Sequence, residues 1–98
     1  MPAAVTVADD LGERLKSAII AGLSERGIDA EVSVQAVPDV DMYRIYASSP
    51  KFRNLWVSER QDIIWKVVDE RFSRAEMLRV SGVVPLTPDE IDGVWPEN

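Results

Sequence analysis

An α+β fold is predicted for this chain, as a two-layer sandwich with the order helix, strand, strand, helix, strand, short helix. Three observations predict it. Two long stretches repeat apolar residues at helical spacing, three short stretches are strand-like, and turn residues separate them. If the second and third strands are neighbours, the intervening helix lies on the same sheet face as the first helix, and the three-stranded sheet is mixed.

The length and composition fit one globular domain over residues 1–98, with 46% hydrophobic and 29% charged residues. The longest apolar run falls short of the ~20 residues of a membrane helix. The first ten residues lack the basic start and long apolar block of a signal peptide, so we expect a cytoplasmic protein. Because the chain has no Cys and no His, it lacks the usual metal ligands and general base, and we expect no metal and no cofactor.

The first half of the chain predicts a helix followed by a hairpin. Residues 8–26 place apolar side chains on one helical face, acidic residues occupy the first turn, and Gly27 ends the helix. Residues 30–37 alternate apolar and polar, as a half-buried strand does. Residues 38–41 supply turn chemistry and residues 42–48 a second strand, so the pair is expected to be antiparallel.

A second long helix is expected to begin at Ser58, with Gln61 completing a capping box, and to end at Arg71 or Phe72. It belongs to the only segment with a basic excess, residues 51–79, which hold seven basic and five acidic side chains. The whole chain has a net charge of −6, which speaks against general nucleic-acid affinity, because phosphate contacts need clustered Lys and Arg. A solvated helix with mixed charges is the commoner meaning of such a segment.

The last elements are a third strand and a short helix. Residues 77–84 are strand-like, and Gly82 within them indicates a bulge or a close backbone approach. Thr87 is the expected N-cap of the short helix, with a proline in its first turn and Glu90 as the acid of a capping box. Gly93 is expected to close this helix.

Two stretches carry a family resemblance. The run "YASSPKFRNLWVSERQDIIWKVVDERF", followed by "LRVSGVVPLTPDEI", resembles the BolA family, and the similarity covers about residues 31–91. The pieces "SPKF" and "LTPDE" are its more specific parts. The resemblance implies a KH-like fold of class II with the order α, β, β, α, β, α. That order agrees with the one obtained above from the residues alone.

The resemblance also implies a partner, a monothiol glutaredoxin, with which BolA proteins share an iron–sulfur cluster. It implies a histidine near the start of the third strand and a second His or Cys in the hairpin-side loop. This chain has Arg79 at the first position, and its loop, residues 37–42, offers Asp39 and Asp41. A guanidinium has no lone pair to donate, and carboxylates are poorly matched to thiolate-held iron. We expect that this chain cannot complete the family's usual cluster site.

The first functional hypothesis is therefore a non-enzymatic adaptor that binds a protein partner without a cluster ligand of its own. Its partner-binding candidates are Arg79 in the third strand and Trp95 beyond the last helix. Trp95 is either a lid on the core or an anchor for a partner, and in a small domain the lid is the commoner role. Arg79 on a solvent-facing strand position is usually only a solubilising residue.

The alternative, from another class, is a KH-like regulator that binds nucleic acid. Lys51, Arg53 and Arg60 are its candidate phosphate contacts, and Phe52 or Trp56 its candidate for stacking on a base. However, the loop "PKFRN" has no glycine, unlike the GXXG loop that clamps the backbone in KH modules. A role in which the two aromatic residues pin the loop to the core is the stronger interpretation.

An enzyme ranks third among the hypotheses. Glu59 with Asp62, or Asp39 with Asp41, supplies the paired carboxylates that general acid–base catalysis needs. Nothing in the sequence marks either pair as buried, and surface carboxylates at this spacing are common. We therefore name no catalytic residue.

Overall fold

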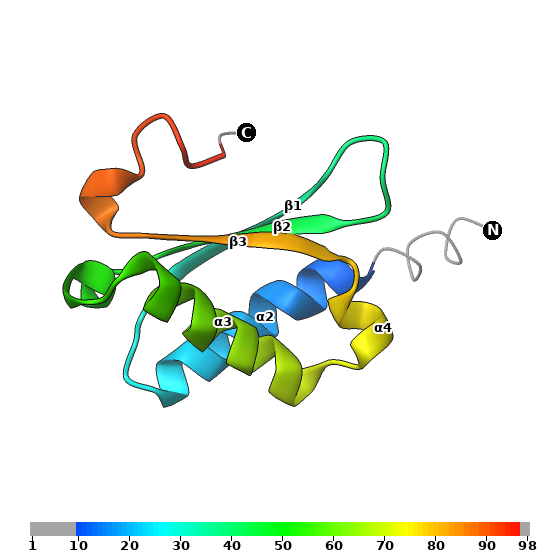
Figure 1. Ribbon diagram of the computed structural model, residues 1–98, viewed down its shortest axis with the longest axis horizontal. Helices are drawn as coiled ribbons and strands as arrows, with labels where there is room; N and C mark the ends of the chain where they lie inside the picture. The colour runs from blue at the N-terminus through cyan, green and yellow to red at the C-terminus, as the bar shows by residue number, and fades with distance from the viewer. Residues whose placement is uncertain (1–9, 97–98) are drawn as a thin grey trace.

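The computed structural model describes residues 10–96 and confirms the α+β sandwich (Figure 1). The sheet has the order β1-β2-β3, with β1 antiparallel and β3 parallel to β2. The predicted first two residues of the first helix lie outside the described residues. The elements are α2 (Asp10–Glu25), β1 (Glu31–Ala36), β2 (Tyr43–Ser48), η1 (Pro50–Asn54), α3 (Val57–Arg71), α4 (Arg74–Met77), β3 (Val80–Leu86) and η2 (Pro88–Glu90), where η marks a 3-10 turn.

Both long helices cover one face of the sheet, and the C-terminal segment lies on the other side (Figure 1). In α2 the buried leucines and isoleucine recur every three or four residues, so one stripe of the helix faces the sheet. Gly27 has a φ of 78° and lies in the turn that follows α2, as the sequence predicts for the residue that ends this helix. Among residues 10–96, none of the helices has both the length and the apolar character of a membrane-spanning segment.

The core lies between the two helices and the inner face of the sheet. Gly22 brings α2 and α3 together, because a Cβ at this position would lie only 2.4 Å from Val67 Cγ1. The side chains with no exposed surface come from both helices, from β2 and from η1. They include Leu15, Ile19, Leu23, Ile45, Ala47, Phe52, Ile64, Val67 and Val68.

The hairpin of β1 and β2 has an unbroken register from Glu31 opposite Ser48 to Ala36 opposite Tyr43. The pairing extends one step into the loop, where the Val37 amide donates to the Met42 carbonyl at 2.9 Å. Asp39 turns the chain with a φ of 68°, a conformation that Asp tolerates better than most residues. The predicted antiparallel hairpin is confirmed.

The expected irregularity in the third strand is a bulge. Tyr43 is opposite Val80 and Arg44 is opposite Gly82, so Ser81 is the extra residue in β3. The prediction of a bulge beside Gly82 is confirmed. Pro85 lies further along the same strand.

The predicted capping box of α3 is wrong by one or two residues. The helix begins at Val57, its N-cap is Trp56, and the Glu59 carboxylate accepts from the Trp56 amide at 2.8 Å. Ser58 therefore lies inside the first turn. Glu59 takes the role that was predicted for Gln61, and the cap amide is that of Trp56 and not that of Ser58.

The predicted third strand also begins too early, because a short helix, α4, occupies its first residue. In α4 the Ser73 hydroxyl accepts from the Glu76 amide, and the Glu76 carboxylate accepts from the Ser73 amide at 2.8 Å. Arg14 on α2 adds an ion pair to Glu76 at 2.8 Å. These bonds satisfy the backbone N–H groups that a single helical turn leaves without partners, and they stabilise α4. The strand β3 therefore starts only at Val80.

The last predicted helix is a single 3-10 turn. Its N-cap is Thr87 as expected, and the Glu90 carboxylate accepts from the Thr87 amide at 2.8 Å. The Thr87 hydroxyl is buried and has no hydrogen-bond partner among the described residues, so the capping bond expected from it is not made. Gly93, with a φ of 76°, belongs to the following turn and does not close η2.

Candidate functional site

The end of the hairpin meets the start of β3 through Arg79 and Asp41. Arg79 Nε donates to the Asp41 carbonyl oxygen at 3.2 Å, and Nη2 forms an ion pair with the Asp41 carboxylate. The guanidinium also lies over the Tyr43 ring, 5.5 Å from its centroid. The two positions that the family resemblance singles out, in the hairpin-side loop and before the third strand, are therefore neighbours in space. Here they hold a closed ion pair and no metal ligand set.

Two exposed apolar side chains flank this ion pair along the chain. Leu78 precedes Arg79 and is 69% exposed, and Val40 precedes Asp41 and is 54% exposed. We call Val40, Asp41, Leu78 and Arg79 the hairpin-end surface. Leu78 was not among the predicted site residues, because the predicted strand ran through it. The capping pattern of Ser73 and Glu76, which starts α4, was the signal in the sequence that a short helix precedes the strand here.

Trp95 lies on the opposite face of the sheet from the helices. Its ring meets the Tyr46 ring edge to face, with centroids 6.1 Å apart and an interplanar angle of 62°. Tyr46 alternates with the buried Ile45 and Ala47 in β2, so its side chain points to the outer face. Trp95 is half-buried there, and the structure does not place it with Arg79. It covers the outer sheet face and stays outside the core between helices and sheet.

Two of the residues considered for nucleic-acid contact lie inside the protein. Phe52 has no exposed surface and belongs to the core, so it has no face free to stack on a base. The Arg60 side chain is also buried: Nε donates to the Leu55 carbonyl at 3.1 Å, and Nη1 reaches Glu90 at 3.0 Å and Pro85 O at 3.3 Å. Arg60 joins α3 to the chain around η2, which accounts for its burial.

The remaining candidates of this region are on the surface. Lys51 is exposed, and Arg53 is exposed but paired with Asp89 at 2.7 Å. Trp56 is 78% exposed, contrary to the expectation that it pins the loop to the core, whereas Phe52 does so. Arg53 and Trp56 line a shallow hollow of about 350 Å³ at the start of α3.

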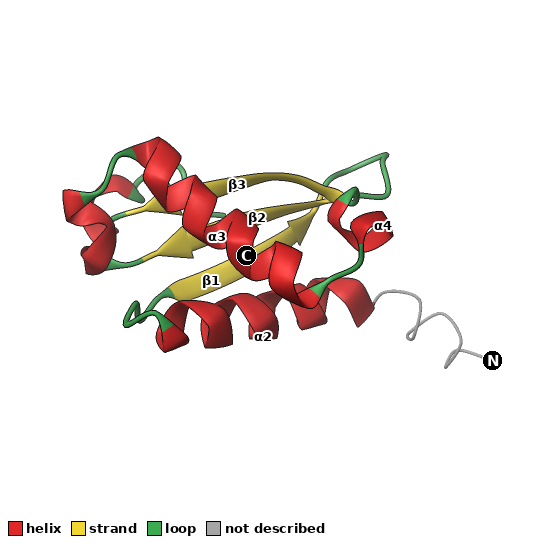
Figure 2. Ribbon diagram, turned by 60° about the horizontal axis from the view of Figure 1, so that its bottom comes forward, coloured by secondary structure: helices red, strands yellow, loops and turns green. Residues whose placement is uncertain are grey.

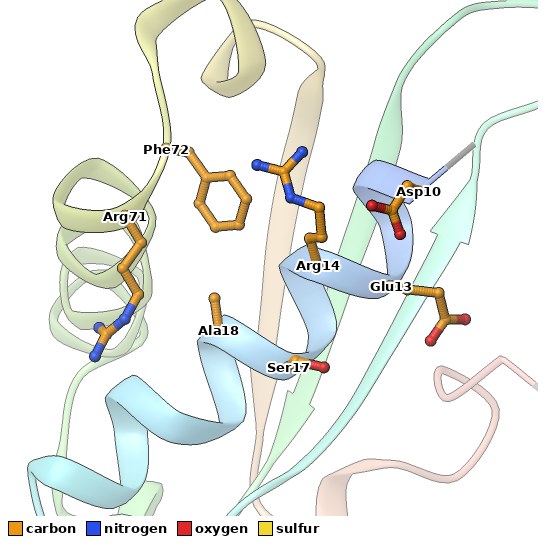
Figure 3. Close-up of a pocket in the computed structure, with 7 residues that line it drawn as sticks. All are labelled: Asp10, Glu13, Arg14, Ser17, Ala18, Arg71 and Phe72. Atoms are coloured by element: carbon orange, nitrogen blue, oxygen red, sulfur yellow. The ribbon is translucent and has the colours of Figure 1, made fainter. Parts of the chain in front are cut away.

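A second hollow, of about 530 Å³, opens between α2 and the end of α3 (Figure 3). Figure 3 shows the Arg14 guanidinium beside the Phe72 ring, 5.4 Å from its centroid. Arg14 also pairs with Glu76, and Arg71 pairs with Glu25 at 2.8 Å. Because both arginines are already neutralised, this hollow offers no free cation to bind an anionic ligand. Its lining residues are Asp10, Glu13, Arg14, Ser17, Ala18, Arg71 and Phe72.

The acidic residues do not converge on a site. Within residues 10–96, no group of three or more His, Cys, Asp or Glu side chains is placed to hold a metal ion. Glu59 caps α3, and Asp39 and Asp62 are exposed. The Thr87 amide, and then Arg60, hold the pKa of Glu90 below its ordinary value, and the Ser73 amide followed by Arg14 does the same for the pKa of Glu76. Both carboxylates serve caps and ion pairs.

Neither family models nor curated proteins give a match to this chain. Its structure is similar to that of BolA1 from Arabidopsis thaliana, with a TM-score of 0.62 and 15% sequence identity, over 84% of this chain and 96% of that one. The chain has a BolA-like fold. The resemblance that the motifs indicated is thus confirmed for the fold, and its functional implications remain to be argued from the surface of this chain.

Proposed function

We propose that this protein is a non-enzymatic adaptor that binds a protein partner through the hairpin-end surface and contributes no ligand to a metal cluster. The BolA-like fold supports this proposal. The family resemblance in the sequence implies a monothiol glutaredoxin, which we take as the partner to test first. The exposed Val40 and Leu78 support the proposal as well, since exposed apolar side chains beside an arginine are common in protein interfaces.

The Arg79–Asp41 ion pair is the observation that carries the proposal. It occupies the place where the resemblance requires ligands, and a protonated guanidinium has no lone pair for iron. Arg79 uses two of its N–H groups on Asp41 and keeps the others for acceptors of a partner. A binding surface is therefore retained where ligation is lost.

Binding is tested by titrating a monothiol glutaredoxin into the protein in a calorimeter. Val40→Glu should weaken binding about tenfold or more, because it places a charge in the apolar part of the interface. Val57→Glu is the matched control, since Val57 is 53% exposed against 54% for Val40 but lies at the start of α3. Equal effects of the two substitutions, or no binding by the parent protein, would contradict this assignment.

A separate measurement tests whether this protein contributes a ligand to the iron–sulfur cluster. Adding the protein to cluster-loaded glutaredoxin should leave the visible circular dichroism of the cluster unchanged, even where calorimetry detects binding. A guanidinium near the cluster only donates hydrogen bonds to its sulfurs. A changed spectrum would refute the missing ligation and would make Asp39 and Asp41 the next residues to substitute.

Nucleic-acid binding is the second candidate, because Trp56 is exposed beside Arg53 in the same hollow. It ranks lower since the net charge is −6, Arg53 is paired with Asp89, and Arg60 is buried. We expect no sub-micromolar binding to a labelled single-stranded oligonucleotide at physiological salt. Such binding, lost in the double variant Lys51→Glu with Arg53→Glu, would reverse the ranking.

A further inference from the structure

The two edges of the sheet differ in how they are protected. β3, at one edge, has a bulge at Ser81 and a proline at position 85, and both features discourage pairing with another strand. β1, at the other edge, has six regularly paired residues, no proline and no bulge, and Glu31 is its only charged residue. Within the described part of the chain, β1 therefore carries neither the bulge nor the proline that hinder strand pairing at the β3 edge.

The hydrogen-bond pattern tells which backbone groups of β1 face outward. In an antiparallel pair, residues alternate between bonding to the partner strand and pointing away from it. The Val37 amide bonds to Met42, so its neighbour Ala36 and, two residues earlier, Val34 point away from β2. The Tyr43 amide confirms this phase, because it donates to the Arg79 carbonyl on the β3 side, at 2.7 Å, and so is unavailable to Ala36.

These outward groups open into a groove. Val34 and Ala36 line a hollow of about 530 Å³ between β1 and the first turns of α2. Figure 2 shows α2 running alongside β1 at this edge of the sheet. Gly12 lets the Tyr43 ring pack closely against α2, because a Cβ at this position would lie only 3.0 Å from Cε1 of the ring, and both residues line the groove. Among the described residues, no other group bonds to the outward N–H and C=O groups of Val34 and Ala36.

We propose that this groove binds an extended peptide segment of a partner protein, which adds to β1 as a fourth strand. The backbone of β1 supplies the hydrogen bonds, and the groove accepts small or β-branched side chains on alternate positions of the peptide. Glu13 and Lys16 line the groove and contribute one charge of each sign, so the groove itself is close to neutral. The net charge of −6 on the whole chain favours a peptide with basic flanks. This surface goes beyond the proposed function.

A second copy of the chain fits this edge less well than a lone peptide. Pairing two β1 strands brings α2 of one copy against α2 of the other, because α2 lies alongside β1 (Figure 2). It also brings together two chains of net charge −6, which repel each other. A single strand without a flanking helix meets neither obstacle.

The probe is the fluorescein-labelled, terminally blocked peptide KVTVTVK, with KVTPTVK as the peptide whose central proline prevents strand pairing. We expect the first peptide, and not the second, to raise the fluorescence anisotropy on titration with the protein. The amide signals of Val34 and Ala36 should shift in NMR spectra and exchange more slowly with solvent. Absence of binding at millimolar protein, or shifts confined to another region such as Trp56, would overturn the proposal.

Ala36→Pro is the decisive variant, with Ala36→Val as its matched control. Proline removes an outward N–H but no bond of the β1–β2 ladder, so the fold should be retained, and far-ultraviolet circular dichroism checks this. We expect Ala36→Pro to weaken peptide binding about tenfold and Ala36→Val to leave it unchanged. Val40→Glu should also leave it unchanged, which separates this groove from the hairpin-end surface. Equal affinities of the two Ala36 variants, or a concentration-dependent dimer that Ala36→Pro abolishes, would overturn the proposal.

Discussion

Gly22→Ala sets two effects of opposite sign against each other at the contact between α2 and α3. Replacing a helical glycine by alanine favours the folded state by about 1 kcal/mol through helix propensity. At this site, however, the new Cβ would lie 2.4 Å from Val67 Cγ1 and 2.7 Å from Arg71 Nη1, against 3.4–4 Å for ordinary contact. The helices must then separate by about 1 Å, and overpacking of this kind costs about 1–3 kcal/mol.

The clash should prevail, because Val67 has no exposed surface and has no free space in which to turn. We expect Gly22→Ala to lower the free energy of unfolding by about 1 kcal/mol in urea titrations monitored by circular dichroism. Ala21→Gly, one residue earlier on the exposed side of α2, is the matched control and should cost about 1 kcal/mol through propensity alone.

A double-mutant cycle tests the mechanism. In the background Val67→Ala, which by itself costs about 2–3 kcal/mol, the clash is relieved, and Gly22→Ala should be neutral or stabilising. A Gly22→Ala protein that is more stable than the parent, or a cycle with no coupling between the two sites, would refute the close contact described here.

Three further predictions concern the C-terminal turn and the loop before α3. Thr87→Val should leave the free energy of unfolding unchanged or raise it by up to about 1 kcal/mol in urea titrations, because the hydroxyl that it removes is buried without a partner; a clear loss of stability would mean that this hydroxyl is hydrogen-bonded. The pKa of Glu90 is lowered in the folded state, so the unfolded chain binds more protons as the pH falls below 4.5, and stability should drop toward the folded-state pKa; Glu90→Gln should reduce that pH dependence, and an unchanged slope would argue against the assignment. Phe52→Ala should cost about 3–5 kcal/mol and Trp56→Ala less than about 0.5 kcal/mol in the same titrations, and similar losses for both would contradict their opposite exposures.

The elements with a long, regular period were predictable from the sequence. The stripe of α2 agrees with the core face observed. The alternation in β1 correctly predicts a strand, but only Val32 of its apolar positions is buried, and Ala36 is exposed. The first and last residues of the elements were less predictable. At α3 the start depends on whether Glu59 bonds to the Trp56 amide or Gln61 bonds to the Ser58 amide, and both patterns fit the sequence.

The surface sites could not be predicted from the sequence, because they depend on which residues the fold brings together. Asp41 and Arg79 were each identifiable as residues of interest, but their ion pair depends on the register of β3 against β2, which the bulge at Ser81 shifts. Phe52 and Trp56 have similar apolar character and lie four residues apart, yet one is fully buried and the other is 78% exposed. Composition does not separate them, because the 3-10 turn η1 decides which ring faces the core.

The parallel pairing of β2 with β3 affects the order in which the protein folds during its synthesis. Synthesis of the β1–β2 hairpin is complete at Ser48, whereas β3 ends at Leu86. The backbone groups of β2 that bond to β3 therefore have no strand partner until α3 and β3 have been synthesised. At a synthesis rate of 5–20 residues per second, this interval lasts about 2 to 8 seconds. During it the second edge of the nascent hairpin is β2, which has neither the bulge nor the proline of β3, and the apolar inner face of the hairpin is covered only by α2. Protection of the growing chain by a chaperone is needed most in this interval, and it is needed less once β3 closes the ladder.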